Sequence, residues 1–106
     1  MSLFKIPDYL EVGDWVYNLH ITSNAIRGTE YMAFRTKVKE IITEENGALS
    51  YRISGSCFVS DDRGTYRLPC NGILGAGADY QGVAIKKKGE REWIPVPPVQ
   101  VKEVNE

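Results

Sequence analysis

The chain has few of the residues that most metal and catalytic sites require. Its 106 residues include two cysteines and one histidine, too few for a tetrahedral zinc site made of these ligands alone. Basic and acidic residues nearly balance at 13 and 14, so the net charge of −1 provides no general attraction to nucleic acid or to an anionic membrane. We therefore expect no metal, no cofactor and no membrane partner.

Long apolar runs are also missing. Uncharged stretches such as residues 68–78 are short and contain glycine and proline, whereas a transmembrane helix needs about 20 apolar residues. The N-terminus has one lysine before residue 8 and no apolar segment typical of a signal peptide. From these absences we expect a cytoplasmic protein.

What the chain does have is short apolar-alternating runs separated by turn signals. This pattern predicts antiparallel strands joined by tight turns, and therefore a single all-β domain over residues 1–106 with an N-terminal arm at residues 1–11. The predicted architecture is a small barrel with extended hairpins, and a small β-sandwich is the alternative. The turn signals are Asn46-Gly47, Asp61-Asp62-Arg63-Gly64, Asn71-Gly72, Gly75-Ala76-Gly77 and Lys88-Gly89.

The first predicted strand covers residues 15–21, and the polar segment 22–28 after it is expected to be a loop. Successive side chains of a strand point to opposite faces. Trp15, Tyr17, Leu19 and Ile21 therefore share one face, opposite Asp14, Val16, Asn18 and His20. We expect the first of these faces to be buried, and we expect the core to contain Trp15, Tyr17, Tyr51 and Tyr66.

The hairpin over residues 34–58 allows a prediction of register. If residues 45–47 form a three-residue turn with Gly47 in the left-handed region, and a β-bulge lies at Lys39-Glu40, every inward pair is apolar or small. The expected pairs are Thr43 with Leu49, Ile41 with Tyr51, Val38 with Ile53 and Phe34 with Cys57. A two-residue turn without the bulge is disfavoured because it buries carboxylates that have no partners.

Two further hairpins follow. The turn at residues 61–64 pairs Ser60 with Thr65, Val59 with Tyr66 and Cys57 with Leu68. Cys70 is then a diagonal neighbour of Cys57, about 7–8 Å away, which predicts two free thiols. The third hairpin runs from Val83 through a turn near Lys88-Gly89 and back through residues 93–94. Its prolines predict an edge strand or a crossover, after which Val99, Val101 and Val104 are expected to close the sheet.

The segment Val12-Gly13-Asp14-Trp15-Val16, followed by meandering strands, resembles the V-G-D-x-V start of SH3-like small barrels. This resemblance covers the first two thirds of the chain. It implies an SH3-like barrel that binds a peptide or nucleic acid and has no catalytic activity.

The clearest candidate binding surface is the outer face of the 34–58 hairpin. Cations beside an aromatic ring suit single-stranded nucleic acid, although a solvated strand face with the same residues is the simpler interpretation. Tyr80 is added as an aromatic residue on the glycine-rich loop, a candidate rim of a binding groove, and Trp93 as an aromatic residue that is hard to bury. Residues 86–88 are interpreted as a solvated hairpin tip. The candidate binding residues are Arg35, Lys37, Lys39, Arg52, Phe58, Tyr80 and Trp93.

The function expected from the sequence is a non-enzymatic protein-interaction or adaptor module, which recognises another protein or a second copy of itself through aromatic side chains. An exposed cluster of Tyr9, Tyr31, Phe58, Tyr80 and Trp93 would mark its partner surface. The alternative is a nucleic-acid-binding module that uses the basic hairpin face. A third hypothesis, a small enzyme around His20, Cys57 and Cys70, is disfavoured because the thiols are expected to face inward and His20 outward.

Overall fold

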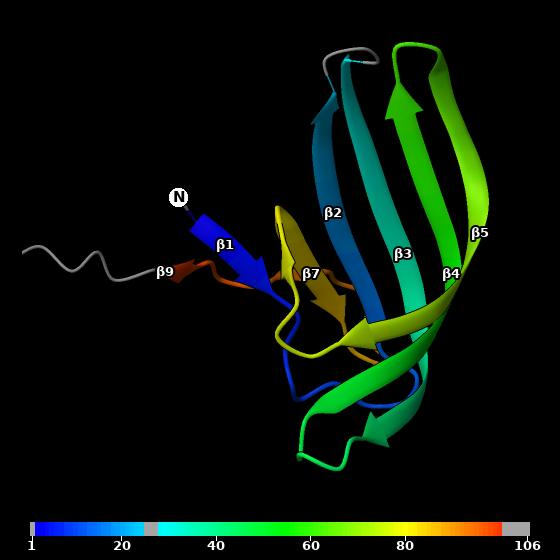
Figure 1. The fold of residues 1–106 in the computed structure, drawn as a ribbon. Helices are drawn as coiled ribbons and strands as arrows, with labels where there is room; N and C mark the ends of the chain where they lie inside the picture. Colours follow the sequence, from blue (N-terminus) through cyan, green and yellow to red (C-terminus); the bar gives the residue numbers. More distant parts are fainter. Residues whose placement is uncertain (1, 25–27, 101–106) are drawn as a thin grey trace, which may run out of the picture.

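The computed structural model describes residues 2–24 and 28–100, and each regular element in this part of the chain is a β-strand. Six strands form one antiparallel sheet in the order β5-β4-β3-β2-β7-β8 (Figure 1). Its members are β2 (Trp15–Asn24), β3 (Gly28–Thr43), β4 (Leu49–Asp61), β5 (Gly64–Gly75), β7 (Gly82–Lys86) and β8 (Ile94–Pro95). The predicted all-β antiparallel class is confirmed. The described residues contain no helix long and apolar enough to cross a membrane.

A second, smaller sheet contains β1 (Ser2–Lys5) between β6 (Asp79–Tyr80) and β9 (Val99–Gln100). Val99 was expected to close the main sheet, but it pairs with Leu3 of β1 instead. Val101 and Val104 lie outside the described residues. Within the residues described, β5 and β8 remain as the two edges of the main sheet, so a closed SH3-like barrel is not confirmed.

The predicted register of the β3–β4 hairpin is confirmed. Val38 pairs with Ile53, Phe34 pairs with Cys57, and the register shifts between Val38 and Glu40, where the bulge was placed. Gly47 in the turn has a φ of 86°, a left-handed conformation that glycine adopts without steric cost. Turn geometry and apolar pairing together therefore specify this hairpin.

The β4–β5 hairpin also has the predicted pairings, and the third hairpin runs along β7 as predicted, although its second strand is Ile94–Pro95 rather than residues 93–94. Cys57 lies opposite Leu68. β7 pairs with β8 at the edge of the sheet, a position that tolerates Pro95, which has no N–H to donate to a ladder hydrogen bond. Asn71-Gly72 was wrongly predicted to be a turn, because Gly72 continues β5 and pairs with Ile53. Of the predicted loop at residues 22–28, residues 22–24 belong to β2 and Gly28 begins β3. Residues 25–27 lie outside the described residues.

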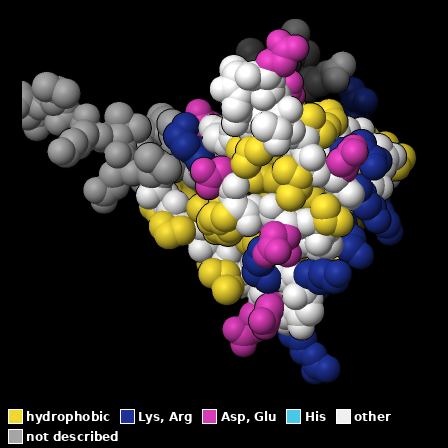
Figure 2. All heavy atoms as spheres, turned by 90° about the horizontal axis from the view of Figure 1, so that it is seen from below, with side chains coloured by type: hydrophobic (Ala, Val, Ile, Leu, Met, Phe, Trp, Pro, Cys, Tyr) yellow, Lys and Arg dark blue, Asp and Glu magenta, His cyan; other side chains and the backbone are white. Residues whose placement is uncertain are grey.

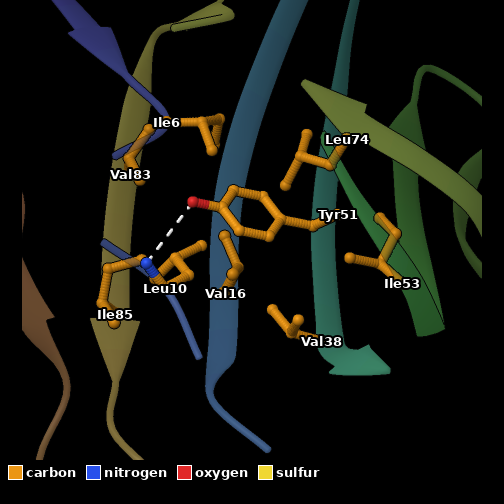
Figure 3. Packing of buried hydrophobic residues seen from close by; sticks show 9 residues of the cluster. All are labelled: Ile6, Leu10, Val16, Val38, Tyr51, Ile53, Leu74, Val83 and Ile85. Carbon is orange, nitrogen blue, oxygen red and sulfur yellow. Dashed lines mark hydrogen bonds between the residues drawn. The ribbon is translucent and has the colours of Figure 1, made fainter. Parts of the chain in front are cut away.

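The core lies on one face of the main sheet, which we call the inner face. The N-terminal arm covers part of this face and contributes Ile6 and Leu10, both almost fully buried. Figure 3 shows Tyr51 among these side chains, with its hydroxyl directed toward the backbone of Leu10. The cluster contains Ile6, Leu10, Val16, Val38, Tyr51, Ile53, Leu74, Val83 and Ile85.

Two predictions about the core are wrong. The buried face of β2 carries Val16 and Asn18, and Asp14 just before the strand is buried on the same side, because the arm covers that side of the sheet. Trp15 and Tyr17 are on the opposite face, where Tyr17 is 37% exposed. Tyr66 is 47% exposed, because it lies on edge strand β5 beyond the part of the inner face that the arm covers. Tyr51 is in the core as predicted.

Candidate functional site

The face of the main sheet opposite the core, here called the outer face, carries cations beside aromatic rings. Strand register and the alternation of side chains define its members. Lys37 of β3 lies between Trp15 of β2 and Ser54 of β4, and Lys86 of β7 pairs with Trp15 from the other side. The central row of this face is thus Lys86–Trp15–Lys37–Ser54, perpendicular to the strands.

Trp15 has three cations around its indole ring. The guanidinium carbon of Arg35 lies 5.5 Å from the ring centroid, Nζ of Lys86 lies 5.9 Å away and Nζ of Lys37 lies 6.0 Å away. Cations at this distance are attracted to the negative face of an aromatic ring. The ring therefore holds three positive charges together at the centre of the sheet.

Trp93 precedes β8 and brings a second indole to the same group. Arg35 lies 5.8 Å and Lys86 lies 5.7 Å from its ring centroid, so these two cations contact both tryptophans. Tyr17 meets Trp93 edge to face, with ring centroids 6.3 Å apart. A hollow of about 380 Å³ lies here, lined by Tyr17, Arg35, Ala84 and Trp93.

The outer face is positively charged although the chain as a whole is not. Its strand-paired positions carry Arg35, Lys37, Arg52, Arg67 and Lys86 but a single carboxylate, that of Glu40, which forms an ion pair with Arg52 at 3.1 Å. In the view from below, Lys and Arg side chains gather mainly along one side of the molecule (Figure 2). The net charge of the whole chain therefore does not describe the local field at this face.

Four of the seven predicted binding residues lie on the main part of the outer face: Arg35, Lys37 and Trp93 form one group, and Phe58 lies apart from them. Lys39 and Arg52 lie farther along, where they line a second hollow with Ser54, Asn71 and Ile73. Tyr80 is not part of the outer face. It is in β6, packs against the core and meets the ring of His20 edge to face with centroids 6.4 Å apart.

The sequence did not identify Trp15, Tyr17 and Lys86 as members of the candidate binding surface. Large aromatic side chains were assigned to the core by hydrophobicity, and residues 86–88 were assigned to a solvated tip balanced by glutamates across their own turn. In the structure Lys86 contacts both tryptophans. Lys87 instead forms ion pairs with Glu11 of the arm and with Asp14, which precedes β2. The predicted cluster of five aromatic residues is not formed: Tyr9 is in the arm and Tyr80 is on the inner side, away from Phe58 and Trp93.

The Gly13-Asp14 pair of the V-G-D-x-V segment has a structural role. Asp14 is completely buried, and its carboxylate accepts hydrogen bonds from Nζ of Lys87 and from the backbone N–H groups of Glu11 and Lys88. Gly13 has a φ of 99°, and a Cβ at this position would lie 2.8 Å from the side chain of Lys88. Because these contacts hold the end of β7 against β2, they help to place Lys86 beside Trp15.

The thiols and the histidine do not form a reactive group. Contrary to expectation, His20 is on the inner face together with Cys57, but Met32 and Phe34 of β3 lie between their strands. Both cysteines are free, and burial raises the pKa of each thiol above 9.0. Among the described residues, no group of three or more His, Cys, Asp or Glu side chains is placed to hold a metal ion.

Comparison with protein-family models, curated proteins and solved structures finds no match to this chain. The function is therefore inferred from the chemistry of the outer face.

Proposed function

We propose that this protein is a non-enzymatic nucleic-acid-binding module that uses the outer face of its six-stranded sheet. The observation that supports this most strongly is the sharing of Arg35 and Lys86 between the rings of Trp15 and Trp93. Cations that hold phosphates beside rings that stack on bases are the combination by which proteins bind unpaired nucleic acid.

The location of the charge supports the same proposal. Phosphate contacts supply most of the affinity of nucleic-acid binding, and they need cations on one accessible surface rather than a basic chain. Arg35 is exposed, while Lys37 and Lys86 are partly exposed, so all three remain accessible to a polyanion. The resemblance to SH3-like modules, which include nucleic-acid binders, agrees with this function, and the SH3-like barrel itself stays a prediction.

The test is fluorescence anisotropy with a short labelled oligonucleotide of mixed sequence, at low and moderate salt. We expect binding that weakens as salt rises, because phosphate contacts release counterions. Lys37→Glu should lower the affinity by roughly tenfold or more, since it places a carboxylate among the cations. Arg63→Glu is the matched control: it makes the same change of charge in the exposed β4–β5 turn and should have a much smaller effect. Absence of binding at low salt would exclude this function.

The protein-interaction function expected from the sequence is the second candidate. Edge strand β5 is 12 residues long, and its residues Tyr66 and Leu68 are 47% and 45% exposed on the inner face. An unpaired edge strand is a template for an extended segment of a partner protein. Pro69 in the middle of this strand lacks an N–H donor, so the edge is a poorer template, and we place this function second. Light scattering tests self-association, and Leu68→Lys should abolish any dimer formed through this edge.

A further inference from the structure

The outer face has a further aromatic residue at a distance from the tryptophans. Phe58 of β4 is 38% exposed, and the guanidinium carbon of Arg67 from β5 lies 5.9 Å from its ring centroid. Like the pair of tryptophans, this is an accessible ring with a cation against it. The outer face thus contains two aromatic–cation sites: the tryptophan site (Trp15, Tyr17 and Trp93 with Arg35, Lys37 and Lys86) and the Phe58 site (Phe58 with Arg67).

Small side chains separate the two sites. Ala33 of β3 pairs with Phe58, Ser56 of β4 pairs with Arg35, and Ser54 pairs with Lys37, so no large side chain at these positions blocks the way between the aromatic rings. Phe58 is two strands and two residues from Tyr17, which at ordinary sheet spacings is roughly 12 Å. One base cannot contact rings at both sites, whereas a chain of nucleotides spaced about 3.4 Å apart covers this distance in three or four steps.

We infer that the ligand is a single strand of at least about four nucleotides, which places one base at the tryptophan site and a later base at the Phe58 site. This inference rests on the proposed function and adds the form and the length of the ligand. A base inside a duplex has both of its faces covered by neighbouring base pairs, so only an unpaired strand presents faces to these rings. The rings and cations recognise features shared by DNA and RNA.

The test compares oligothymidylates of two, four and eight nucleotides, the eight-nucleotide oligouridylate and a blunt duplex, by competition against the labelled oligonucleotide. We expect the affinity to rise steeply between two and eight nucleotides, the eight-nucleotide DNA and RNA to bind within a few-fold of each other, and the duplex to bind more weakly. A duplex that binds as tightly as the single strand, or an affinity independent of length, would overturn the inference.

Single substitutions distinguish the contributions of the two sites to the binding affinity. Phe58→Ala should weaken binding of the eight-nucleotide strand by roughly tenfold and leave the dinucleotide unchanged, whereas Trp93→Ala should weaken both. Tyr66→Ala is the control, because Tyr66 is an exposed aromatic residue on the inner face, and it should change neither. Thermal melting by circular dichroism confirms that each variant folds. If Phe58→Ala has no effect while Lys37→Glu still weakens binding, the two-site inference fails and the proposed function stands.

Discussion

Nζ of Lys87 donates a hydrogen bond to Oδ2 of Asp14 across 73 residues of sequence, at a distance of 2.5 Å. The Asp14 side chain is 1% exposed, and the Lys87 side chain is 33% exposed. The carboxylate also accepts two backbone N–H groups, so it has several partners in an environment with almost no water. A buried charge needs such compensation, and this one joins the N-terminal arm to the end of β7.

Asp14→Asn should therefore destabilise the fold by about 1–3 kcal/mol, because it weakens the bond to Lys87 and leaves that ammonium without its main partner. Urea denaturation measures the change. Asp79→Asn is the matched control: Asp79 pairs with Lys5 at 2.7 Å, but its side chain is 47% exposed, and the loss should stay below about 1 kcal/mol. Equal losses in the two variants would contradict this account of the buried pair.

The same pair predicts how stability depends on pH. Burial alone raises the pKa of Asp14, but the hydrogen bonds from Lys87 and from two backbone N–H groups outweigh it, and the pKa falls below its usual 3.8. The stability contributed by this group is complete above the unfolded-state value and is lost as the pH falls through the folded pKa. The hydrogen bond to Asp14 raises the pKa of Lys87 above 10.5, so its contribution is present below that value and is lost in stronger base.

Urea midpoints measured from acid to base test this dependence. The wild-type protein should lose stability below pH 3.8 and above pH 10.5, whereas Asp14→Asn should be less stable at neutral pH and lose less in acid. An acid loss of the same size in both proteins would show that other carboxylates are responsible.

Tyr51→Phe should loosen the arm. The Tyr51 hydroxyl donates to the carbonyl of Pro7 at 2.9 Å and accepts from the N–H of Leu10 at 3.4 Å. Removing it should lower the free energy of unfolding by about 1 kcal/mol, because one buried and one partly buried backbone group lose their partner. The Leu10 amide should also exchange faster with deuterium. Tyr66→Phe, at an exposed hydroxyl, should change neither quantity.

Gly55→Ala should be one of the most damaging single substitutions in the main sheet. A Cβ at this position would lie 2.2 Å from the carbonyl oxygen of Arg35, so β3 and β4 would have to move apart. We expect a loss of about 3 kcal/mol or more in a denaturant melt. Gly72→Ala in β5 is the matched control, since its Cβ would meet nothing within 4 Å, and its stability should be unchanged or slightly higher. A mild effect of Gly55→Ala would contradict the close approach of the two strands.

The cysteines should react slowly with iodoacetamide in the folded protein at neutral pH. Burial raises the pKa of both thiols, which lowers the fraction of reactive thiolate, and Cys57 is 4% exposed. Mass spectrometry over time should show Cys70 modified before Cys57, and both should react rapidly in urea. Rapid native labelling of Cys57 would show that this part of the inner face opens.

Much of the local pairing was predictable from the sequence, because hairpin register depends on turn chemistry and on the apolar pattern of neighbouring residues. The three-residue turn placed Gly47 in the left-handed region, and a two-residue turn without the bulge at Lys39-Glu40 would have buried carboxylates. The structure has both the left-handed Gly47 and the bulge. Three of the predicted binding residues, Arg35, Lys37 and Phe58, also lie on the outer face, because strand alternation and hairpin register place them on one side.

The sequence by itself thus determined the all-β class, the hairpin registers and the free thiols, all of which depend on residues close to one another along the chain. Only the tertiary structure decided which side of β2 is buried. The arm packs Ile6 and Leu10 against the side that carries Val16, and this leaves Trp15 and Tyr17 on the outer face. Contacts between residues far apart in sequence also bring Lys86 and Trp93 to Trp15. Alternation within a strand defines two faces, but which face is covered depends on where a distant segment packs.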